Sequence, residues 1–292
     1  MQYRIGNDKI SVEIDSLGGQ IRSLKAADGS EYLWQGDEKF WKGQAPNLFP
    51  YIGRMTDKSY TYEGTKYHME IHGFVKVREM TVEDQGEDYI IFRLDSDDET
   101  KKSYPFTFSL WIRYHLEESK ICIAYEVMNR DEKQMYFGIG GHPGFRVPNQ
   151  EGVEFTDYYL EFEDGIEPVR VGFSEACFVD GTEEAFELGE GQSLDLHHGM
   201  FDDDAIVLKN VGKSVELKCR KGGSSIRLEF PELPYFGIWH TPGKEAPFVC
   251  LEPWSSLPSR QDVVEELTTQ ENLVSLEPGK TYENNWSIGI IR

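Results

Sequence analysis

One histidine in this sequence stands inside a frame of glycine and proline, in residues 138–145 (GIGGHPGF). Glycine allows a backbone to approach a ligand closely, and proline fixes a turn and removes a backbone donor. The backbone around His142 is therefore expected to be held in place. Because a histidine side chain titrates near neutral pH, the pattern favours a proton-transfer role for His142. The alternative is a histidine that makes a hydrogen bond in the core.

Two shorter segments carry side chains suited to related chemistry. His72 precedes glycine and phenylalanine in residues 71–74 (IHGF), and Glu252 precedes proline and tryptophan in residues 250–254 (CLEPW). Taken alone, His72 is also open to the alternative of a core hydrogen bond. We expect both segments to meet the histidine frame in one groove and to move protons there.

The surroundings of Glu252 predict an unusual carboxylate. In the run FVCLE, strand alternation places Glu252 on the same face as Phe248 and Cys250. A carboxylate on an apolar face is partly desolvated, and desolvation raises its pKa toward the range useful for a general base. The competing interpretation is that Glu252 only forms an ion pair with Arg54 or Arg260.

Four further histidines stand in polar surroundings. His68 falls in a hairpin of alternating polarity, His115 lies on the polar face of a strand, and His197 and His198 share a polar turn. We expect a surface or hydrogen-bonded structural role for each of them.

Several kinds of chemistry are disfavoured by the motifs. Asp202, Asp203 and Asp204 lack the alternating ligands and the later glutamate of an EF-hand. Asp204 precedes an expected strand, and from that position its side chain can point into a groove. No H-E-x-x-H, P-loop, G-x-S-x-G or dinucleotide motif is present, which disfavours metal, nucleotide and serine-nucleophile chemistry. The four cysteines form no C-x-x-C pair and are expected to be free thiols.

The charge of the chain bears on its partners. The formal net charge is −22 and the pI is near 4.7, which works against nucleic acids and anionic membrane surfaces. The first ten residues contain no apolar run typical of a signal peptide, and no apolar run approaches the 18 or so residues of a membrane span. We expect a cytoplasmic protein.

Alternation of apolar and polar residues dominates the 292-residue chain. Strands are expected at residues 10–14, 19–24, 60–67 (a hairpin), 89–94, 106–116, 120–128, 158–162, 205–209, 214–218, 224–230, 236–239, 248–251 and 282–290. Only residues 259–268 show helical spacing. Residues 40–56 are aromatic and non-periodic, and are expected to cover the core or line a pocket. This pattern predicts an all-β fold, a large antiparallel β-sandwich with few short helices, and one domain of residues 1–292.

Five stretches, in this order along the chain, resemble motifs of the aldose 1-epimerase (mutarotase) family, and most of all its LacX-like bacterial branch. They are residues 47–54 (NLFPYIGR), 72–74 (HGF), 140–145 (GGHPGF), 201–205 (FDDDA) and 251–254 (LEPW). The resemblance spans almost the whole chain. It implies a galactose mutarotase-like β-supersandwich with a sugar bound in a groove.

The resemblance also implies roles for particular residues. Glu252 is the expected general base, His142 the expected general acid, and His72 the residue that positions the sugar and supports charge at the ring oxygen. Arg54 and Asp204 are expected to bind sugar hydroxyls, with Asp202 and Asp203 as alternatives to Asp204.

Other side chains are expected to contact the sugar without transferring protons. Asn47 is assigned to sugar binding. Trp254, Trp239 and Phe145 offer flat apolar surfaces to a sugar face, although core packing is expected for at least one of them.

The implied reaction opens the ring of a free hexose and closes it on the other face, so that α and β anomers interconvert. A carboxylate and an imidazolium suit this exchange near pH 7, and neither a metal nor an organic cofactor is required. The expected partner is a small sugar, with no nucleic acid and no membrane, bound by a monomer or a homodimer.

Three alternatives remain. A hexose-phosphate 1-epimerase is the first, although family members of that kind carry an arginine soon after His-Gly-Phe where this chain has Val75 and Lys76. A non-catalytic sugar-binding or sensor protein on the same fold is the second. A glycosidase that uses Asp204 and Glu252 is the third.

Overall fold

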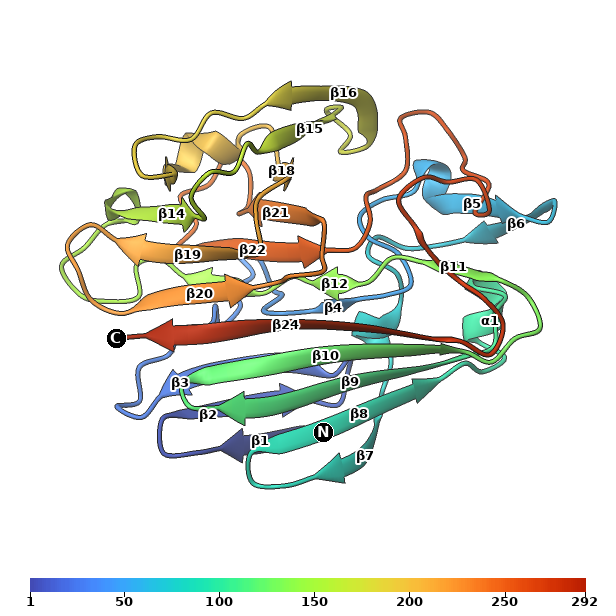
Figure 1. The fold of residues 1–292 in the computed structure, drawn as a ribbon, viewed down its shortest axis with the longest axis horizontal. Helices are drawn as coiled ribbons and strands as arrows, with labels where there is room; N and C mark the ends of the chain where they lie inside the picture. The colour runs from blue at the N-terminus through green and yellow to red at the C-terminus, as the bar shows by residue number, and fades with distance from the viewer.

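The computed structural model describes residues 1–292, and its largest element is a nine-stranded sheet. In spatial order the sheet contains β17 (Ser193–Asp195), β14 (Tyr158–Phe162), β19 (Ser214–Cys219), β20 (Ser225–Glu229), β24 (Thr281–Ile291), β10 (Lys120–Asn129), β9 (Phe108–Glu117), β8 (Tyr89–Asp95) and β7 (Thr81–Gln85). In Figure 1 the long strand β24 crosses the middle of the molecule, with β20 and β19 on one side and β10, β9 and β8 on the other. Strands from both halves of the chain therefore share one sheet.

A second sheet carries the segments singled out in the sequence. It contains β16 (Val179–Ala185), β15 (Val169–Phe173), β18 (Ile206–Lys209), β21 (Tyr235–Trp239), β22 (Phe248–Trp254), β12 (Gly140–Gly141) and β4 (Asn47–Leu48), with β13 (Gly144–Arg146) also paired to β22. The pairings of β22 are antiparallel on both sides. Strand β22 thus lies between the histidine frame and β21.

Three small sheets and five short helices complete the fold. The sheets are β1 (Gln2–Gly6), β2 (Ile10–Asp15) and β3 (Gln20–Ala26); β5 (Ser59–Tyr62) and β6 (Thr65–His68); and β11 (Met135–Phe137) and β23 (Val274–Leu276). The helices are α1 (Thr100–Ser103), η1 (Thr56–Lys58), η2 (Val75–Val77), η3 (Phe155–Asp157) and η4 (His198–Phe201). None of the helices has the length and apolar character needed to span a lipid bilayer. The predicted antiparallel β-sandwich with few short helices is confirmed.

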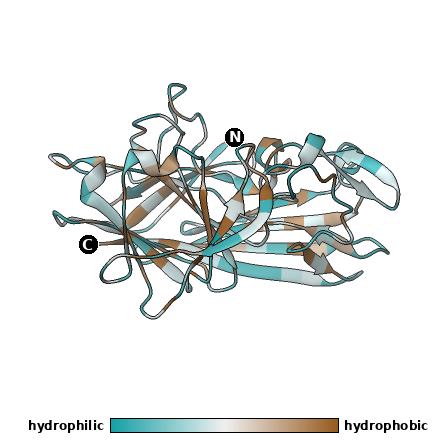
Figure 2. Ribbon diagram, turned by 90° about the horizontal axis from the view of Figure 1, so that it is seen from above, coloured by the Kyte–Doolittle hydropathy of each residue, from teal (hydrophilic) through white to brown (hydrophobic).

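The core follows directly from the alternation in the sequence. Every second residue of β10 is buried, and the same holds for the second half of β9, its hairpin partner. One cluster of 62 buried residues extends from Ile5 near the N-terminus to Ile290 near the C-terminus. In Figure 2 the peripheral loops are mainly hydrophilic and the hydrophobic stretches lie on interior strands. Burial of a large apolar side chain contributes roughly 1.5–3 kcal/mol, so this core is the main source of stability.

The helix predicted for residues 259–268 is wrong. The segment is irregular, with turns at residues 261–262 and 267–268, and with Arg260 bridged to Val179 and Glu266 bridged to Thr61. Asp262 has a φ of 59°, a left-handed conformation that no right-handed helix contains. Pairing with two strand edges therefore overrides the helical spacing of the apolar residues.

Candidate active site

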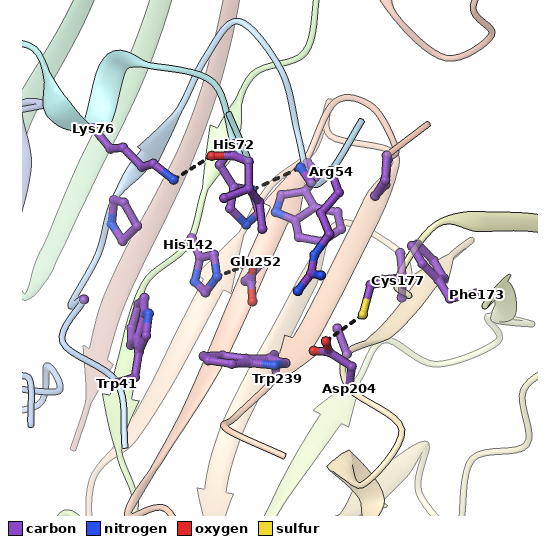
Figure 3. A pocket seen from close by; sticks show the side chains of 18 of the residues that line it. Trp41, Arg54, His72, Lys76, His142, Phe173, Cys177, Asp204, Trp239 and Glu252 are labelled. Atoms are coloured by element: carbon purple, nitrogen blue, oxygen red, sulfur yellow. Dashed lines mark hydrogen bonds and ion pairs between the residues drawn. The ribbon is translucent and has the colours of Figure 1, made fainter. Parts of the chain in front are cut away.

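A cavity of about 510 Å³ opens over the second sheet and brings together most of the predicted site residues. Its lining includes Arg54, His72, His142, Asp204, Glu252 and Trp254. Figure 3 shows the first five of these side chains converging from several elements, with Trp41 at one end and Phe173 at the other. Residues separated by almost 200 positions in the sequence thus share one pocket.

His142 and Glu252 form the centre of the cavity. Glu252 lies on β22, and His142 lies between β12 and β13, both of which pair with β22. The distance between His142 Nε2 and Glu252 Oε2 is 3.2 Å. Both side chains are nearly fully buried, and Glu252 Oε2 and His142 Nδ1 make no hydrogen bond. The strand pairing therefore holds a carboxyl group and an imidazole in contact, and one polar atom of each group makes no hydrogen bond.

The glycines of residues 138–145 are needed for close packing around this pair. A Cβ on Gly140 would lie 2.5 Å from the carbonyl oxygen of Pro253, and one on Gly141 would lie 2.5 Å from the Trp286 ring. Since only glycine avoids these clashes, the segment can lie directly against β22 and the core. The position of His142 depends on that approach.

Burial moves the pKa values of the two groups in opposite directions. Burial, followed by the negative charge of Asp204, raises the pKa of Glu252 well above 4.5. Burial lowers the pKa of His142 to about 3, and the positive charge of Lys76 acts in the same direction. Both shifts favour the uncharged forms. The empty site therefore favours a protonated Glu252 beside a neutral His142, rather than the carboxylate and imidazolium expected from the sequence.

His72 is held as a hydrogen-bond donor. Its Nδ1 accepts the backbone N–H of Gly53 at 3.1 Å, which assigns the proton of the neutral ring to Nε2. Burial is the largest cause that lowers the pKa of His72 well below 6.5, and the neighbouring His142, Lys76 and Arg54 act in the same direction. The His72 ring stands edge-on to that of His142, with centroids 5.4 Å apart. A neutral imidazole with one N–H is therefore available beside the acid–base pair.

The backbone of His72 is strained in a way that is common at functional sites. His72 has a φ of 62°, in the left-handed region that residues other than glycine rarely adopt. The following Gly73 packs so closely on Phe49 that a Cβ would lie 2.2 Å from the Phe49 carbonyl oxygen. This close packing holds the His72 turn against the loop that carries Gly53.

Two tryptophans lie beside His142 and Glu252. The Trp41 ring stacks on His142 with centroids 5.0 Å apart and planes 23° apart. The Trp239 ring, on β21, lies nearly perpendicular to that of His142, with centroids 5.8 Å apart and planes 81° apart. Both indoles line the cavity and are only partly buried, so they offer apolar faces to a ligand. Phe145, by contrast, is fully buried in the core, as expected for at least one of the three aromatic candidates.

Arg54 and Asp204 lie on the opposite side of Glu252 from Trp41 (Figure 3). The Asp204 carboxylate accepts a hydrogen bond from the Cys177 thiol at 2.7 Å, and the neighbouring Asp203 also lines the cavity. Burial, with Asp204 as the next cause, raises the pKa of Cys177 to about 12. Among the three aspartates, Asp204 is thus the one anchored at the cavity wall.

The ion-pair interpretation of Glu252 is wrong. Arg260 is bound instead by Glu265, with guanidinium-to-carboxylate distances of 2.9 and 2.8 Å. Arg54 is exposed and forms no ion pair with Glu252. Glu252 therefore has no arginine to stabilise its charge, which is why burial dominates its pKa.

The structure does not bring Asn47 to the cavity, so its predicted sugar-binding role is replaced by a structural one. Its side-chain amide donates to the carbonyl oxygens of Gly18 and Gly19 and to the Tyr114 hydroxyl, at 3.0 to 3.1 Å. Its carbonyl oxygen accepts from the Tyr125 hydroxyl at 2.8 Å. Asn47 is buried and fully hydrogen-bonded, so it ties β4 to β9, β10 and the turn before β3.

Other histidines lie away from the cavity. His68 and His115 are exposed, and His68 pairs with Glu70. His198 Nδ1 lies 3.0 Å from Nε2 of the buried His240, which the sequence patterns did not single out. These positions agree with surface or hydrogen-bonded structural roles.

Lys76, which stands where phosphosugar relatives carry an arginine, also reaches the cavity. It lines the cavity from η2, four residues after His72, and donates to the Ile71 carbonyl oxygen at 2.6 Å. Phe173 and Cys177 were not identified from the sequence, because only the tertiary position of β15 and its following turn brings them to the cavity.

Known proteins match this chain along its whole length. A family model described as aldose 1-epimerase matches residues 1–289. The plasmid-encoded protein LacX of Lactococcus lactis subsp. lactis is 33% identical over 300 residues, with all of both chains covered. A galactose mutarotase related enzyme from Lactobacillus acidophilus is 31% identical, with a TM-score of 0.95 over 100% of this chain and 98% of that chain. A galactose mutarotase-like protein from Lactobacillus casei is 30% identical, with a TM-score of 0.93 over 99% and 100%.

The antiparallel β-sandwich with a cavity over one sheet has the fold of the galactose mutarotase-like structures that it matches. The chain belongs to the aldose 1-epimerase family.

The structural role of Asn47 is testable by substitution. Asn47→Ala removes four buried hydrogen bonds, and although Tyr114 still donates to Gly19 and Tyr125 to Gly140, the Gly18 carbonyl oxygen loses its side-chain donor. Each buried group left unsatisfied costs about 1–3 kcal/mol, so we expect the free energy of unfolding, measured by urea denaturation, to fall by about that amount. Asn285→Ala, at an exposed position on β24, should leave it nearly unchanged. A variant of Asn47 with native stability and a raised KM for sugar would contradict this assignment.

Proposed function

We propose that this protein is an aldose 1-epimerase that interconverts the α and β anomers of a free hexose. The observation that carries the proposal is the buried contact of 3.2 Å between His142 and Glu252, two proton-exchanging groups whose charge no arginine or lysine neutralises by an ion pair. A pure binding protein has no need for such a pair. Membership of the aldose 1-epimerase family supports the same conclusion.

The cavity supplies the groups that orient a hexose. Arg54 and Asp204 hydrogen-bond hydroxyls on the part of the ring remote from the reaction. Trp41 and Trp239 cover its apolar face. The Nε2–H of His72 donates to the ring oxygen, where negative charge develops as the ring opens. These contacts place the anomeric carbon over Glu252 and His142.

The reaction requires one proton to be taken and one to be given. Glu252 removes the proton of the anomeric hydroxyl, and His142 gives a proton to the ring oxygen as the bond between that oxygen and the anomeric carbon breaks. The aldehyde rotates about the adjacent carbon–carbon bond, and the two transfers run in reverse on its other face. Positioned acid–base groups contribute about a hundred- to ten-thousand-fold each.

The charge state of the pair sets the order of the proton transfers. Ring opening consumes a carboxylate and an imidazolium and leaves a carboxylic acid and a neutral imidazole. Both forms hold the same number of protons. Burial favours the neutral form beside the closed sugar as well, as the raised pKa of Glu252 and the lowered pKa of His142 indicate. A proton therefore passes from Glu252 to His142, across their contact of 3.2 Å, before the ring opens.

A hexose-phosphate 1-epimerase is the second candidate, and Lys76 is the observation in its favour. The Lys76 ammonium lines the cavity with Arg54, and burial lowers its pKa from 10.5. A phosphate group on the sugar would stabilise the charged form of Lys76. We rank it second because one N–H of Lys76 is already used by Ile71 and the chain as a whole is strongly acidic.

Polarimetry on freshly dissolved α-D-glucose and α-D-galactose tests the main proposal. We expect the protein to accelerate mutarotation above the buffer rate, and Glu252→Gln to lose at least about a hundredfold of that acceleration, because an amide cannot take the proton. His142→Asn should be similarly impaired, while His115→Asn, at an exposed position, keeps the native rate. No acceleration with either sugar or with a hexose 6-phosphate would leave a non-catalytic sugar-binding role.

The pH dependence of kcat/KM follows from the direction of the shifts. The active pair holds one proton, and a second proton must be added to His142, whose pKa is lowered from 6.5 to about 3. Activity should therefore not decline as the pH is lowered from 6.5 to about 5, because the acid limb lies below that range. Because the pKa of Glu252 is raised, the pair loses its one proton at a pH well above 4.5. An acid limb with its midpoint near 6.5 would contradict the neutral pair.

Lys76→Met distinguishes the two candidate substrates. If a free hexose is the substrate, Lys76→Met should change kcat/KM for the hexose by less than about threefold. The native protein should then show no higher kcat/KM for a sugar 6-phosphate than for the free hexose. Lys66→Met, on the exposed face of β6, provides the matched control. A large preference for the phosphate that Lys76→Met abolishes would replace the first candidate by the second.

A further inference from the structure

A third potential metal-binding side chain lies beside the acid–base pair. The ligand atoms of His142, Cys250 and Glu252 all lie within 4.8 Å of one another, and the three residues are buried. Cys250 and Glu252 are two residues apart on β22, so they share one face of the strand. Gly144, two residues after His142, pairs with Cys250. The cluster is thus built by two adjacent antiparallel segments.

We propose that this cluster binds a thiophilic divalent cation, with Zn²⁺ as the physiological example, and that the bound cation inhibits the protein. An imidazole nitrogen, a thiolate sulfur and a carboxylate oxygen are the ligands that Zn²⁺ prefers, and three protein ligands leave the fourth position open to the cavity. The metal is an inhibitor in this proposal, and the epimerase reaction does not use it.

The distances favour zinc over larger cations. Tetrahedral zinc with usual bond lengths places nitrogen and oxygen ligands about 3.4 Å apart. The separation of His142 Nε2 and Glu252 Oε2 is 3.2 Å, so these two ligands are already in place. Sulfur and nitrogen ligands lie about 3.6 Å apart in such a site. Cys250 Sγ, which lies within 4.8 Å of both other ligand atoms, therefore has at most about 1 Å to close. Ca²⁺ and Mg²⁺ take six or more oxygen ligands and do not match this set.

The electrostatics of the cluster also favour a divalent cation. Binding releases the thiol proton of Cys250 and the carboxyl proton of Glu252 to solvent, and a thiolate and a carboxylate then balance the two positive charges. The buried site stays neutral overall, which avoids the large cost of an uncompensated buried charge. Glu252 Oε2, which makes no hydrogen bond in the empty site, gains a partner.

Inhibition follows because the metal occupies the atoms that move protons. Once Glu252 and His142 are ligands, neither can exchange a proton with a sugar. The effect on rate rests on the proposed epimerase function, whereas metal binding itself does not. Cys250 takes no part in that function, since it does not line the cavity. Substitution of Cys250 therefore alters the proposed metal site without altering a residue of the proposed reaction.

Cadmium absorbance and zinc inhibition together test the proposal on the full-length protein. Titration with CdCl₂ should produce a thiolate-to-cadmium ultraviolet band, and ZnCl₂ should slow sugar mutarotation reversibly, with EDTA restoring the rate. MgCl₂ should do neither. Cys250→Ser should keep the metal-free rate, lose the band and weaken zinc inhibition by about tenfold or more. Cys177→Ser, which alters the thiol at the other end of the cavity, should keep both effects of the metals.

A second variant keeps the test independent of activity. Glu252→Gln should weaken zinc binding, measured by isothermal titration calorimetry, even though its rate is already lost. A cadmium band that persists in Cys250→Ser, zinc inhibition that this variant does not relieve, or no zinc binding to the native protein would overturn the proposal. If no sugar is turned over but the band depends on Cys250, the metal site stands and the proposed function fails.

Discussion

The exclusion of water from the contact between His142 and Glu252 is the constraint on which the rest of the site depends. In water the two groups would exist as an imidazolium and a carboxylate over part of the neutral range. Behind Trp41 and Trp239, without a neighbouring ion pair, their charged forms lose solvation that nothing in the empty cavity replaces. This loss of solvation is the largest cause of the raised pKa of Glu252 and of the lowered pKa of His142. A protonated Glu252 beside a neutral His142 is the result.

The surrounding fold maintains that contact with rigid elements. Glu252 lies in the middle of a sheet, and both partners of β22 constrain the direction of its side chain. Glycine at positions 140 and 141 lets the His142 segment lie against this strand without a gap. The Asn47 network then ties the same sheet to the core strands β9 and β10. A pair separated by 3.2 Å is thus supported by hydrogen bonds and packing several residues away.

Sequence patterns predicted the parts of the molecule that depend on local periodicity. The hairpin of β9 and β10 and the face shared by Phe248, Cys250 and Glu252 follow from strand alternation, which is a property of the backbone. The desolvation of Glu252 was predictable for the same reason. The grouping of His72, His142 and Glu252 in one groove required in addition the likeness to family motifs.

What the sequence did not reveal depends on contacts between distant segments. The apolar spacing of residues 259–268 is helical, but strand-edge bridges to Val179 and Thr61 override it. Asn47 stands within a recognisable motif, yet its amide is consumed by Gly18, Gly19 and two tyrosines. Cys250 gave no sign of proximity to His142, because that proximity arises only from the pairing of β13 with β22. In each case a tertiary partner decides the role of the residue.

The most direct measurement of the central claim is infrared difference spectroscopy of the protein against its Glu252→Gln variant near pH 7. A neutral pair predicts the C=O stretch of a protonated carboxyl group that the variant lacks, and this band should shift or diminish when a hexose is added. A difference spectrum that shows only carboxylate bands for Glu252 would mean that the pair is ionised in the empty cavity. Burial would then not set the position of the proton, and no proton transfer from Glu252 to His142 would be needed before the ring opens.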